Sequence, residues 1–206
     1  EIDKLQGIPQ AKKYHPEGDV FEHTKNVTQA MAKNPDWQKL SEKERSKLML
    51  AALTHDFGKV THTQEHSDGR ITSIGHDKAG VDPMKKFLGR IMSSGEAAKI
   101  GKDLEPFVKR HMFHSNFDQN LTKKSVARLS QDVGDLSKFN ILMQSDMSKH
   151  LPKEITARKF AEADELNFKK LNQISEELGV SKEPVKSLVQ GRDLIKSGLV
   201  SPGPKM

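Results

Sequence analysis

An imidazole and a carboxylate stand side by side in the segment LTHDFGK, where His55 and Asp56 close an apolar run. Gly58 follows two residues later, and glycine is typical of a helix end. One interpretation is an accidental pair of polar residues at the end of a helix. The other is that both side chains bind one metal ion, because imidazole nitrogen and carboxylate oxygen are common metal ligands.

Other potential ligands occur singly along the chain, at His23, His76, His111 and Asp146. A single His on an apolar helix face, such as His23, is more often a hydrogen-bonded core residue than a ligand. Asp146 lies in the apolar segment FNILMQSDMSKH, where an unpaired carboxylate is costly to bury. A salt bridge with Lys149 or partial exposure would also explain a carboxylate at this position. A helical bundle could bring these separate side chains together into one metal site.

The spacing of apolar residues predicts that helices carry these side chains. It predicts one helix over residues 19–33, with Asp19 as N-cap, and another over 41–58, where Ser41 opens a capping box. Residues 59–76 are rich in Thr, Ser, Gly and His, which predicts a loop with one short extended segment. Further helices are predicted at about 77–93, 96–114, 122–133, 137–150 and 156–179, with short helices in the tail. The predicted fold class is all-α.

Helix geometry limits how His55 and Asp56 can share an ion. Consecutive residues point ~100° apart around a helix, so both reach one ion only if it lies near the helix end. Gly58 would let the chain turn sharply there. We therefore expect the second helix to stop where the metal site begins.

The composition is that of a globular chain with a mild attraction for anions. It has 206 residues, of which 34% are hydrophobic and 30% charged, and a net charge of +6. Such a charge attracts phosphate groups, although it equally serves ordinary solubility. The absence of Cys leaves His, Asp and Glu as the metal ligands and fits a cytoplasmic protein. No segment resembles a membrane span or a signal peptide, so no membrane association is expected.

Several segments together resemble a known family. The residues His23, His55, Asp56 and Asp146 match the His, His-Asp and Asp pattern of the HD-domain phosphohydrolases. More narrowly, YHPEGDVFEHT, LTHDFGKVTHT, GHDKAG, KRHM and the tail GRDLIKSGLVSPGPKM look like the HD region of bacterial tRNA nucleotidyltransferases, the CCA-adding enzymes. The resemblance covers nearly the whole chain in the family's order.

This resemblance implies an HD-domain helical bundle over residues 1–155 and a small C-terminal helical appendage over 156–206. The CCA-adding enzymes also carry an N-terminal polymerase head, to which nothing in this sequence corresponds. We therefore expect no extension of tRNA when the chain is incubated with CTP and ATP. Template-free addition of CCA, measured on a sequencing gel, would contradict this expectation.

The resemblance also implies the ligands of a divalent cation such as Mg²⁺, Mn²⁺, Ni²⁺, Fe²⁺ or Co²⁺. The implied ligands are His23, His55, Asp56 and Asp146. His76 and His111 match positions that complete a second ion in binuclear members, where Asp56 would be the bridge. From the sequence alone, one bound ion is preferred over two.

Three basic residues are candidates for contacting the substrate. Lys59, three residues after the implied catalytic residue Asp56, could touch a phosphate, with a solvated loop lysine as the alternative. Arg90 is a second candidate, for which a surface helix position is the stronger expectation. Lys149 is the third, because the family's last Asp is usually followed by Gly-Arg, where this chain has DMSKH.

By this resemblance the chain is expected to be a metal-dependent phosphohydrolase acting on phosphoesters of nucleotides or RNA ends. The expected activities are 2',3'-cyclic phosphodiesterase, 2'-nucleotidase and phosphatase. One alternative is a non-catalytic module that binds tRNA or other RNA, and another is an HD nucleotidase for free mononucleotides. A single Trp and a single Tyr argue against a broad aromatic platform for stacking bases.

Overall fold

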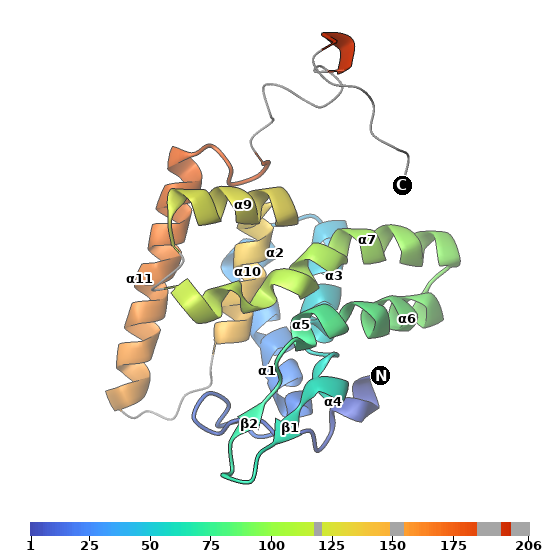
Figure 1. Cartoon of the computed structure of the whole chain (residues 1–206), viewed down its shortest axis with the longest axis vertical. Helices are drawn as coiled ribbons and strands as arrows, with labels where there is room; N and C mark the ends of the chain where they lie inside the picture. Colours follow the sequence, from blue (N-terminus) through green and yellow to red (C-terminus); the bar gives the residue numbers. More distant parts are fainter. Residues whose placement is uncertain (118–120, 149–154, 185–194, 199–206) are drawn as a thin grey trace.

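The computed structural model describes residues 1–117, 121–148, 155–184 and 195–198, and helices dominate this part of the chain (Figure 1). This confirms the predicted all-α fold class. The α-helices are α1 (Val20–Lys33), α2 (Pro35–Gln38), α3 (Glu42–Thr54), α4 (Lys59–His62), α5 (His76–Ala79), α6 (Val81–Ile91), α7 (Ser94–Arg110), α9 (Lys123–Val133), α10 (Leu136–Met147) and α11 (Ile155–Glu177). Two 3₁₀ helices, η1 (Ile2–Leu5) and η2 (His111–Asn116), and two short antiparallel strands, β1 (Gln64–Glu65) and β2 (Ile71–Thr72), complete it.

Local signals in the sequence account for several helix starts. Asp19 caps α1 by accepting a hydrogen bond from the backbone N–H of Glu22 at 2.9 Å. Ser41 and Glu44 form the predicted capping box at the start of α3. These caps satisfy backbone donors that the first helical turn leaves without partners. The helices predicted over 19–33, 122–133 and 156–179 are confirmed to within two residues at each end.

The predicted boundaries are wrong where the chain packs closely against itself. The second helix stops at Thr54 rather than at Gly58. The segment predicted as a loop over 59–76 also contains α4 and β1, whereas β2 confirms the short extended segment predicted there. The helix predicted over 77–93 is divided at Gly80 into α5 and α6. The helix predicted over 96–114 ends at Arg110 and continues as η2. Of the helix predicted over 137–150, the last residues lie outside the described part of the chain.

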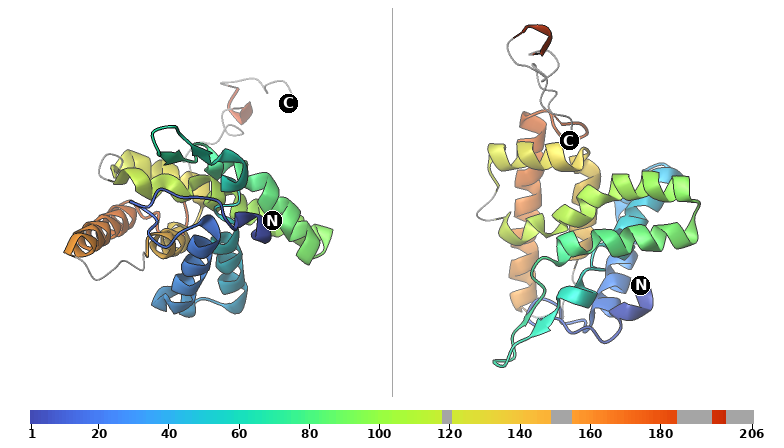
Figure 2. Two further views of the ribbon diagram at one scale, coloured as in Figure 1. Left: turned by 90° about the horizontal axis from the view of Figure 1, so that it is seen from below. Right: turned by 45° about the vertical axis from the view of Figure 1, so that its right-hand side comes forward.

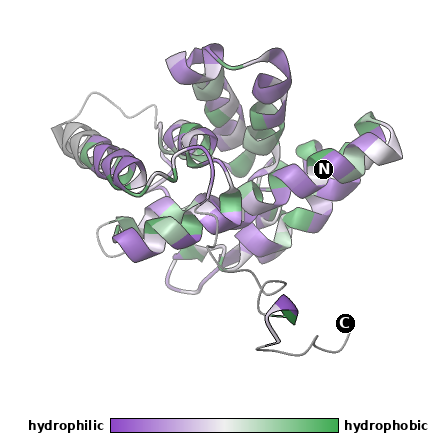
Figure 3. Ribbon diagram, turned by 90° about the horizontal axis from the view of Figure 1, so that it is seen from above, coloured by the Kyte–Doolittle hydropathy of each residue, from purple (hydrophilic) through white to green (hydrophobic). Residues whose placement is uncertain are grey.

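Two groups of helices form the body of the molecule. In one, α1, α3 and α10 pack against one another, and in the other α6 and α7 form an antiparallel pair that also contacts α3 (Figure 2). The longer helices of these groups carry both hydrophilic and hydrophobic residues along their length (Figure 3). The apolar residues of α1, α3, α7 and α10 share one core, which includes Val27, Met31, Leu48, Ala51, Ala52, Leu104, Val108, Leu142 and Met143. Burial of each of the larger side chains stabilises the folded state by about 1.5–3 kcal/mol. This core therefore holds the ends of the helices in fixed positions.

The long helix α11 packs on α9 and α10 and adds Phe168, Leu171 and Ile174 to the same core. The division of the chain at residue 155 stays a prediction. The short helices predicted in the tail fall largely on residues 185–194 and 199–206, outside the described residues. Within the described residues, no helix combines the length and the apolar character that crossing a membrane requires.

Candidate metal centre

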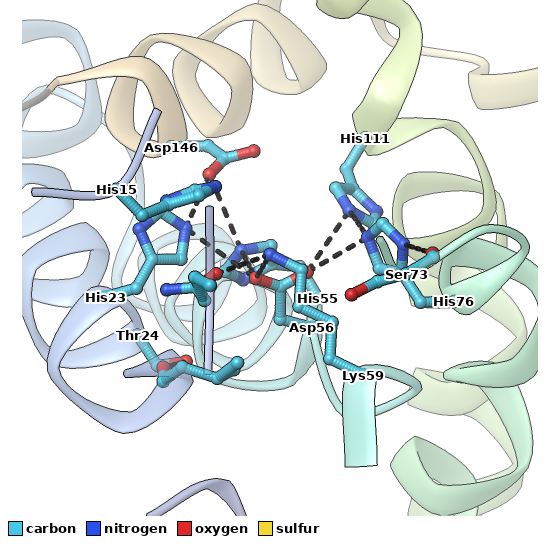
Figure 4. A network of polar contacts seen from close by, with 12 residues as sticks. His15, His23, Thr24, His55, Asp56, Lys59, Ser73, His76, His111 and Asp146 are labelled. Atoms are coloured by element: carbon cyan, nitrogen blue, oxygen red, sulfur yellow. Dashed lines mark hydrogen bonds and ion pairs between the residues drawn. The ribbon is translucent and has the colours of Figure 1, made fainter. Parts of the chain in front are cut away.

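Five elements bring all six predicted ligands together in the interior of the molecule (Figure 4). His23 lies in α1 and Asp146 lies near the end of α10, while His55 and Asp56 directly follow α3. His76 begins α5, and His111 begins η2. Five of the six residues are buried, and Asp146 is partly buried with a side chain that is 8% exposed. Polar groups at this depth require partners, so their arrangement calls for an explanation.

The first group consists of His23, His55, Asp56 and Asp146. Nε2 of His23 lies 2.9 Å from Oδ1 of Asp146 and 3.7 Å from Oδ2 of Asp56. Nε2 of His55 lies 3.3 Å from the same Asp56 oxygen and 3.6 Å from Asp146 Oδ1. The ligand atoms of His23, His55 and Asp146 all lie within 4.8 Å of one another, and Oδ2 of Asp56 faces both imidazoles.

The second group consists of Asp56, His76 and His111 and uses the other oxygen of Asp56. Oδ1 of Asp56 lies 3.2 Å from Nε2 of His76 and 3.5 Å from Nε2 of His111. The two Nε2 atoms face each other at 3.0 Å. Asp56 thus stands between the groups, with one oxygen toward each (Figure 4).

Hydrogen bonds at the far side of each ring determine which nitrogen faces inward with a lone pair. Nδ1 of His55, His76 and His111 lies 2.6–2.7 Å from the backbone carbonyl of Ala52, Ser73 and Val108, respectively. A carbonyl can only accept, so each Nδ1 carries a hydrogen, and in the neutral ring each Nε2 is an acceptor. Two acceptors that face each other at 3.0 Å, as in His76 and His111, require a proton or a cation between them.

The Asp56 carboxylate is buried and contacts mainly side-chain nitrogens. Among the described residues, both of its oxygens and Nε2 of His55 lack a well-aligned hydrogen bond, although Nζ of Lys59 lies 2.7 Å from Oδ2 and several imidazole nitrogens lie at ion-pair distance. Buried polar atoms of this kind are rare in native proteins and point to an unfilled requirement such as an ion.

The charges of the two groups are set by their mutual contacts. Burial raises the pKa of Asp56, but the positive charges of Lys59 and His55 outweigh it and hold this pKa well below its usual value. Burial likewise raises the pKa of Asp146, which His55 and His23 bring well below the usual value. Burial lowers the pKa of His55, but the two carboxylates raise it to about 10. The carboxylates therefore remain ionised, and a bound divalent ion would take over part of the charge compensation that Lys59 and His55 provide.

The spacing of the donor atoms fits ions of the first transition row. Ligands at about 2.1 Å from an ion lie about 3.0 Å apart at octahedral angles and about 3.4 Å apart at tetrahedral angles. The separations between imidazole nitrogens and carboxylate oxygens within the two groups range from 2.9 to 3.7 Å. Imidazole and carboxylate ligands suit Mn²⁺, Fe²⁺, Co²⁺ and Ni²⁺, and carboxylates also suit Mg²⁺. The residues present therefore fit the predicted divalent cation, and they provide for two.

Comparison with known families decides how this centre is to be classified. The profile of the family described as HD domain matches residues 20–169, which is more than half of the chain. The chain belongs to the HD-domain family. This places it in the superfamily of metal-dependent phosphohydrolases and confirms the resemblance seen in the sequence.

The HD domain also has bacterial relatives that carry the name multifunctional CCA protein. The protein of Pasteurella multocida is 37% identical over 93 residues, which cover 44% of this chain and 20% of the relative. That of Halorhodospira halophila is 30% identical over 133 residues, which cover 65% of this chain and 28% of the relative. The chain thus matches about a fifth to about a quarter of the length of these relatives. No solved structure matches the chain.

Gly58 allows a close contact between backbones rather than the sharp turn that was predicted for it. Its φ of −69° and ψ of −19° are ordinary right-handed helical values, so no special turn requires glycine there. A Cβ on Gly58 would instead lie 2.0 Å from the carbonyl oxygen of His76 and 2.6 Å from the backbone nitrogen of Gly80. The absence of a side chain lets the segment after His55–Asp56 touch the backbone of α5, which carries His76.

Lys59 is buried beside the centre rather than solvated in a loop. Its Nζ lies 2.7 Å from Oδ2 of Asp56 and 2.7 Å from Oε1 of Gln10. A cation in this position offsets the negative charge of Asp56 and adds positive charge next to the first group. Its role toward a phosphate stays a prediction.

The other two predicted substrate contacts are Arg90 and Lys149, of which the structure describes only Arg90. Arg90 lies at the end of α6 with an exposed side chain, where it pairs with Glu1 at 2.8 Å. Its ion pair is therefore with the N-terminal segment, so Arg90 is not part of the proposed site. Lys149 lies outside the described residues.

Two residues of the centre, Glu17 and Gln10, were missed by reasoning from the sequence. Oε1 of Glu17 lies 2.7 Å from Nδ1 of His23 and 3.0 Å from Nδ1 of His15. Both residues lie in an irregular segment, where no periodicity shows which side chains point inward. The one available signal for Glu17 was the resemblance of the segment YHPEGDVFEHT, which contains it, whereas Gln10 lies ahead of that segment.

Proposed function

We propose that this chain is a metal-dependent hydrolase of phosphoesters in nucleotides or RNA ends, most specifically a 2',3'-cyclic phosphodiesterase with 2'-nucleotidase and phosphatase activity. The observation that carries the proposal is the buried Asp56 carboxylate, whose two oxygens each meet a separate group of imidazole Nε2 atoms. Membership of the HD-domain family supports the reaction class.

In this proposal the first ion is bound by His23, His55, Asp56 and Asp146, and a second by Asp56, His76 and His111. Divalent ions held in this way lower the pKa of a bound water and stabilise the charge on a phosphoryl group.

The protein's own residues supply the positions and the remaining charges. The carbonyls of Ala52, Ser73 and Val108 hold three of the rings with Nε2 inward, so little reorganisation is needed when an ion binds. Asp56 connects the two groups rigidly, because it directly follows α3 and is fully enclosed. Lys59 keeps a positive charge beside Asp56 Oδ2, where it can stabilise a phosphate oxygen of the substrate.

The proposed substrates follow from the charge of the chain and from its relatives. The net charge of +6 favours anionic ligands, and the relatives carry CCA, a tRNA-end sequence, in their name. A non-catalytic RNA-binding module is the alternative from a different class, and a hydrolase of free mononucleotides is another. The buried carboxylate with two facing groups of ligands favours catalysis over simple binding, since RNA binding needs surface cations rather than buried acids.

A substrate panel with metal removal tests the proposal. The chain, treated with EDTA and then supplied singly with Mg²⁺, Mn²⁺, Fe²⁺, Co²⁺ or Ni²⁺, is incubated with 2',3'-cyclic AMP, 2'-AMP, 5'-AMP and p-nitrophenyl phosphate. We expect turnover of the cyclic and 2'-phosphate substrates with at least one ion, and background rates in EDTA, because the ligands alone do not activate water.

Each other outcome selects an alternative. Turnover confined to 5'-AMP would select the hydrolase of free mononucleotides. Salt-dependent binding of tRNA in a gel-shift assay, together with no turnover of any substrate with any ion, would overturn the proposal in favour of the RNA-binding module.

A further inference from the structure

The segment that precedes α1, residues 6–19, lies ahead of the residues matched by the family profile, yet it contacts the metal centre. It is anchored by two hydrogen bonds, from Gly7 N–H to Asp19 Oδ2 at 2.7 Å and from Val20 N–H to the carbonyl of Ile8 at 3.1 Å. From this segment Glu17 reaches His23 and Gln10 reaches Lys59. The centre is therefore completed by residues outside the matched region.

Glu17 has an unusual position among the partners of the four imidazoles. The rings of His55, His76 and His111 are each held by a neutral backbone carbonyl. The ring of His23 is held by a carboxylate instead, with Glu17 Oε1 2.7 Å from Nδ1, and the Glu17 side chain is only 11% exposed. A carboxylate behind a ligating imidazole fixes the ring and makes the inward nitrogen a stronger donor to a metal.

The group of His15, Glu17 and His23 could itself be taken for a cation site, since their ligand atoms lie within 4.8 Å of one another. The distances between these atoms indicate hydrogen bonds rather than a cation site. One oxygen of Glu17 lies at 2.7 Å and 3.0 Å from the two Nδ1 atoms, which are the distances of N–H···O bonds. A hydrogen on Nδ1 of His23 is donated to Glu17, which leaves Nε2 to bind a metal ion or, without one, to carry a second hydrogen toward Asp146 Oδ1 at 2.9 Å.

We infer that Glu17 is a positioning residue that holds the His23 ring toward the first ion site and raises the metal affinity of that site, an inference that rests on the proposed metal centre. Glu17 contacts neither the second group of ligands nor Asp56. Its removal is therefore expected to weaken one ion site and leave the site of Asp56, His76 and His111 intact.

The test compares Glu17→Ala and Glu17→Gln with a matched control, Glu22→Gln. Glu22 lies on α1 five residues further on and pairs with Lys25 at the surface, so its replacement removes the same charge away from the centre. Titration calorimetry with Mn²⁺ and the visible absorption spectrum with Co²⁺ measure the ion sites, and thermal unfolding without metal measures stability.

We expect Glu17→Ala to weaken one class of site about 100-fold and Glu17→Gln about 10-fold, the range typical for outer partners of metal ligands. The amide oxygen of Gln can still accept from Nδ1 but carries no charge, so it restores part of the affinity. The Co²⁺ spectrum of that site should change, whereas Glu22→Gln should match the unmodified chain in both measurements.

The failures of the two proposals are distinguishable. If the unmodified chain binds neither Mn²⁺ nor Co²⁺, the metal centre itself is rejected. If it binds ions and both Glu17 variants bind them equally well, or lose only thermal stability, then the inference about Glu17 alone is overturned. Should Glu17→Ala not fold, Glu17→Gln, which is nearly isosteric, decides the question by itself.

Discussion

We expect Asp56→Asn to lower the metal-dependent hydrolysis of 2',3'-cyclic nucleotides by at least ~100-fold, the scale of losing metal or electrostatic stabilisation. Both oxygens of Asp56 are directed to ligand groups, one to His55 and one to His76. An Asn offers one neutral oxygen and an amide nitrogen that cannot bind a cation. It can therefore serve at most one of the two groups. Steady-state kinetics and the metal content after dialysis measure the effect.

A second Asp→Asn substitution provides the control. Asp68 lies at the tip of the β1–β2 hairpin, half exposed and paired with Arg70, so Asp68→Asn removes the same charge outside the centre. Its activity should equal that of the unmodified chain. Full activity and metal content in Asp56→Asn would reject the role of Asp56 in the centre. Loss of activity together with a collapsed circular-dichroism spectrum would show that Asp56 mainly holds the fold.

The second large effect is expected from Gly58→Ala. The added Cβ would meet the carbonyl oxygen of His76 at 2.0 Å, and backbone atoms cannot swing away as a flexible side chain can. Overpacking of this kind lowers the free energy of unfolding by about 2–3 kcal/mol. Because α5 must move, His76 should also lose its position against Asp56 and His111, and the second ion with it. Urea unfolding and Mn²⁺ titration measure the two effects.

Gly89→Ala is the matched control for this substitution. Gly89 is exposed within α6, and a Cβ there would meet nothing within 4 Å. Alanine in a helix interior is favoured over glycine by about 0.5–1 kcal/mol, so this variant should be slightly more stable. Equal stability of Gly58→Ala and the unmodified chain would contradict the close contact with α5.

The helices that could be predicted are those with strong local signals. Asp19 and Ser41 cap the helices that they were expected to cap, because a cap bonds within its own first turn. The break at Gly80 and the end of α3 at Thr54 could not be predicted in this way. Both belong to the place where the backbones of Gly58, His76 and Gly80 touch, and that contact joins segments about twenty residues apart.

The same distinction applies to the candidate centre. The types and order of His23, His55, Asp56 and Asp146 pointed to the ligand set, and the structure brings these four together. Lys59, predicted from its nearness in sequence to Asp56, lies beside that residue, whereas Arg90 occupies the surface helix position that was the stronger expectation for it and pairs with Glu1. Charge alone carries no information about direction, so a basic residue on an amphipathic helix is a weak indicator of a site.

By itself, the sequence determined the all-α class, most of the helices and the chemical kind of the ligands, because propensity, capping and side-chain chemistry are local properties. Only the tertiary structure decided that Asp56 faces two groups at once, that every inward nitrogen is Nε2, and that Glu17 stands behind His23. These features depend on the distances between helix ends and on which nitrogen of each imidazole ring finds a hydrogen-bond acceptor behind it. Packing of the shared core sets those distances, and no spacing along the chain encodes them.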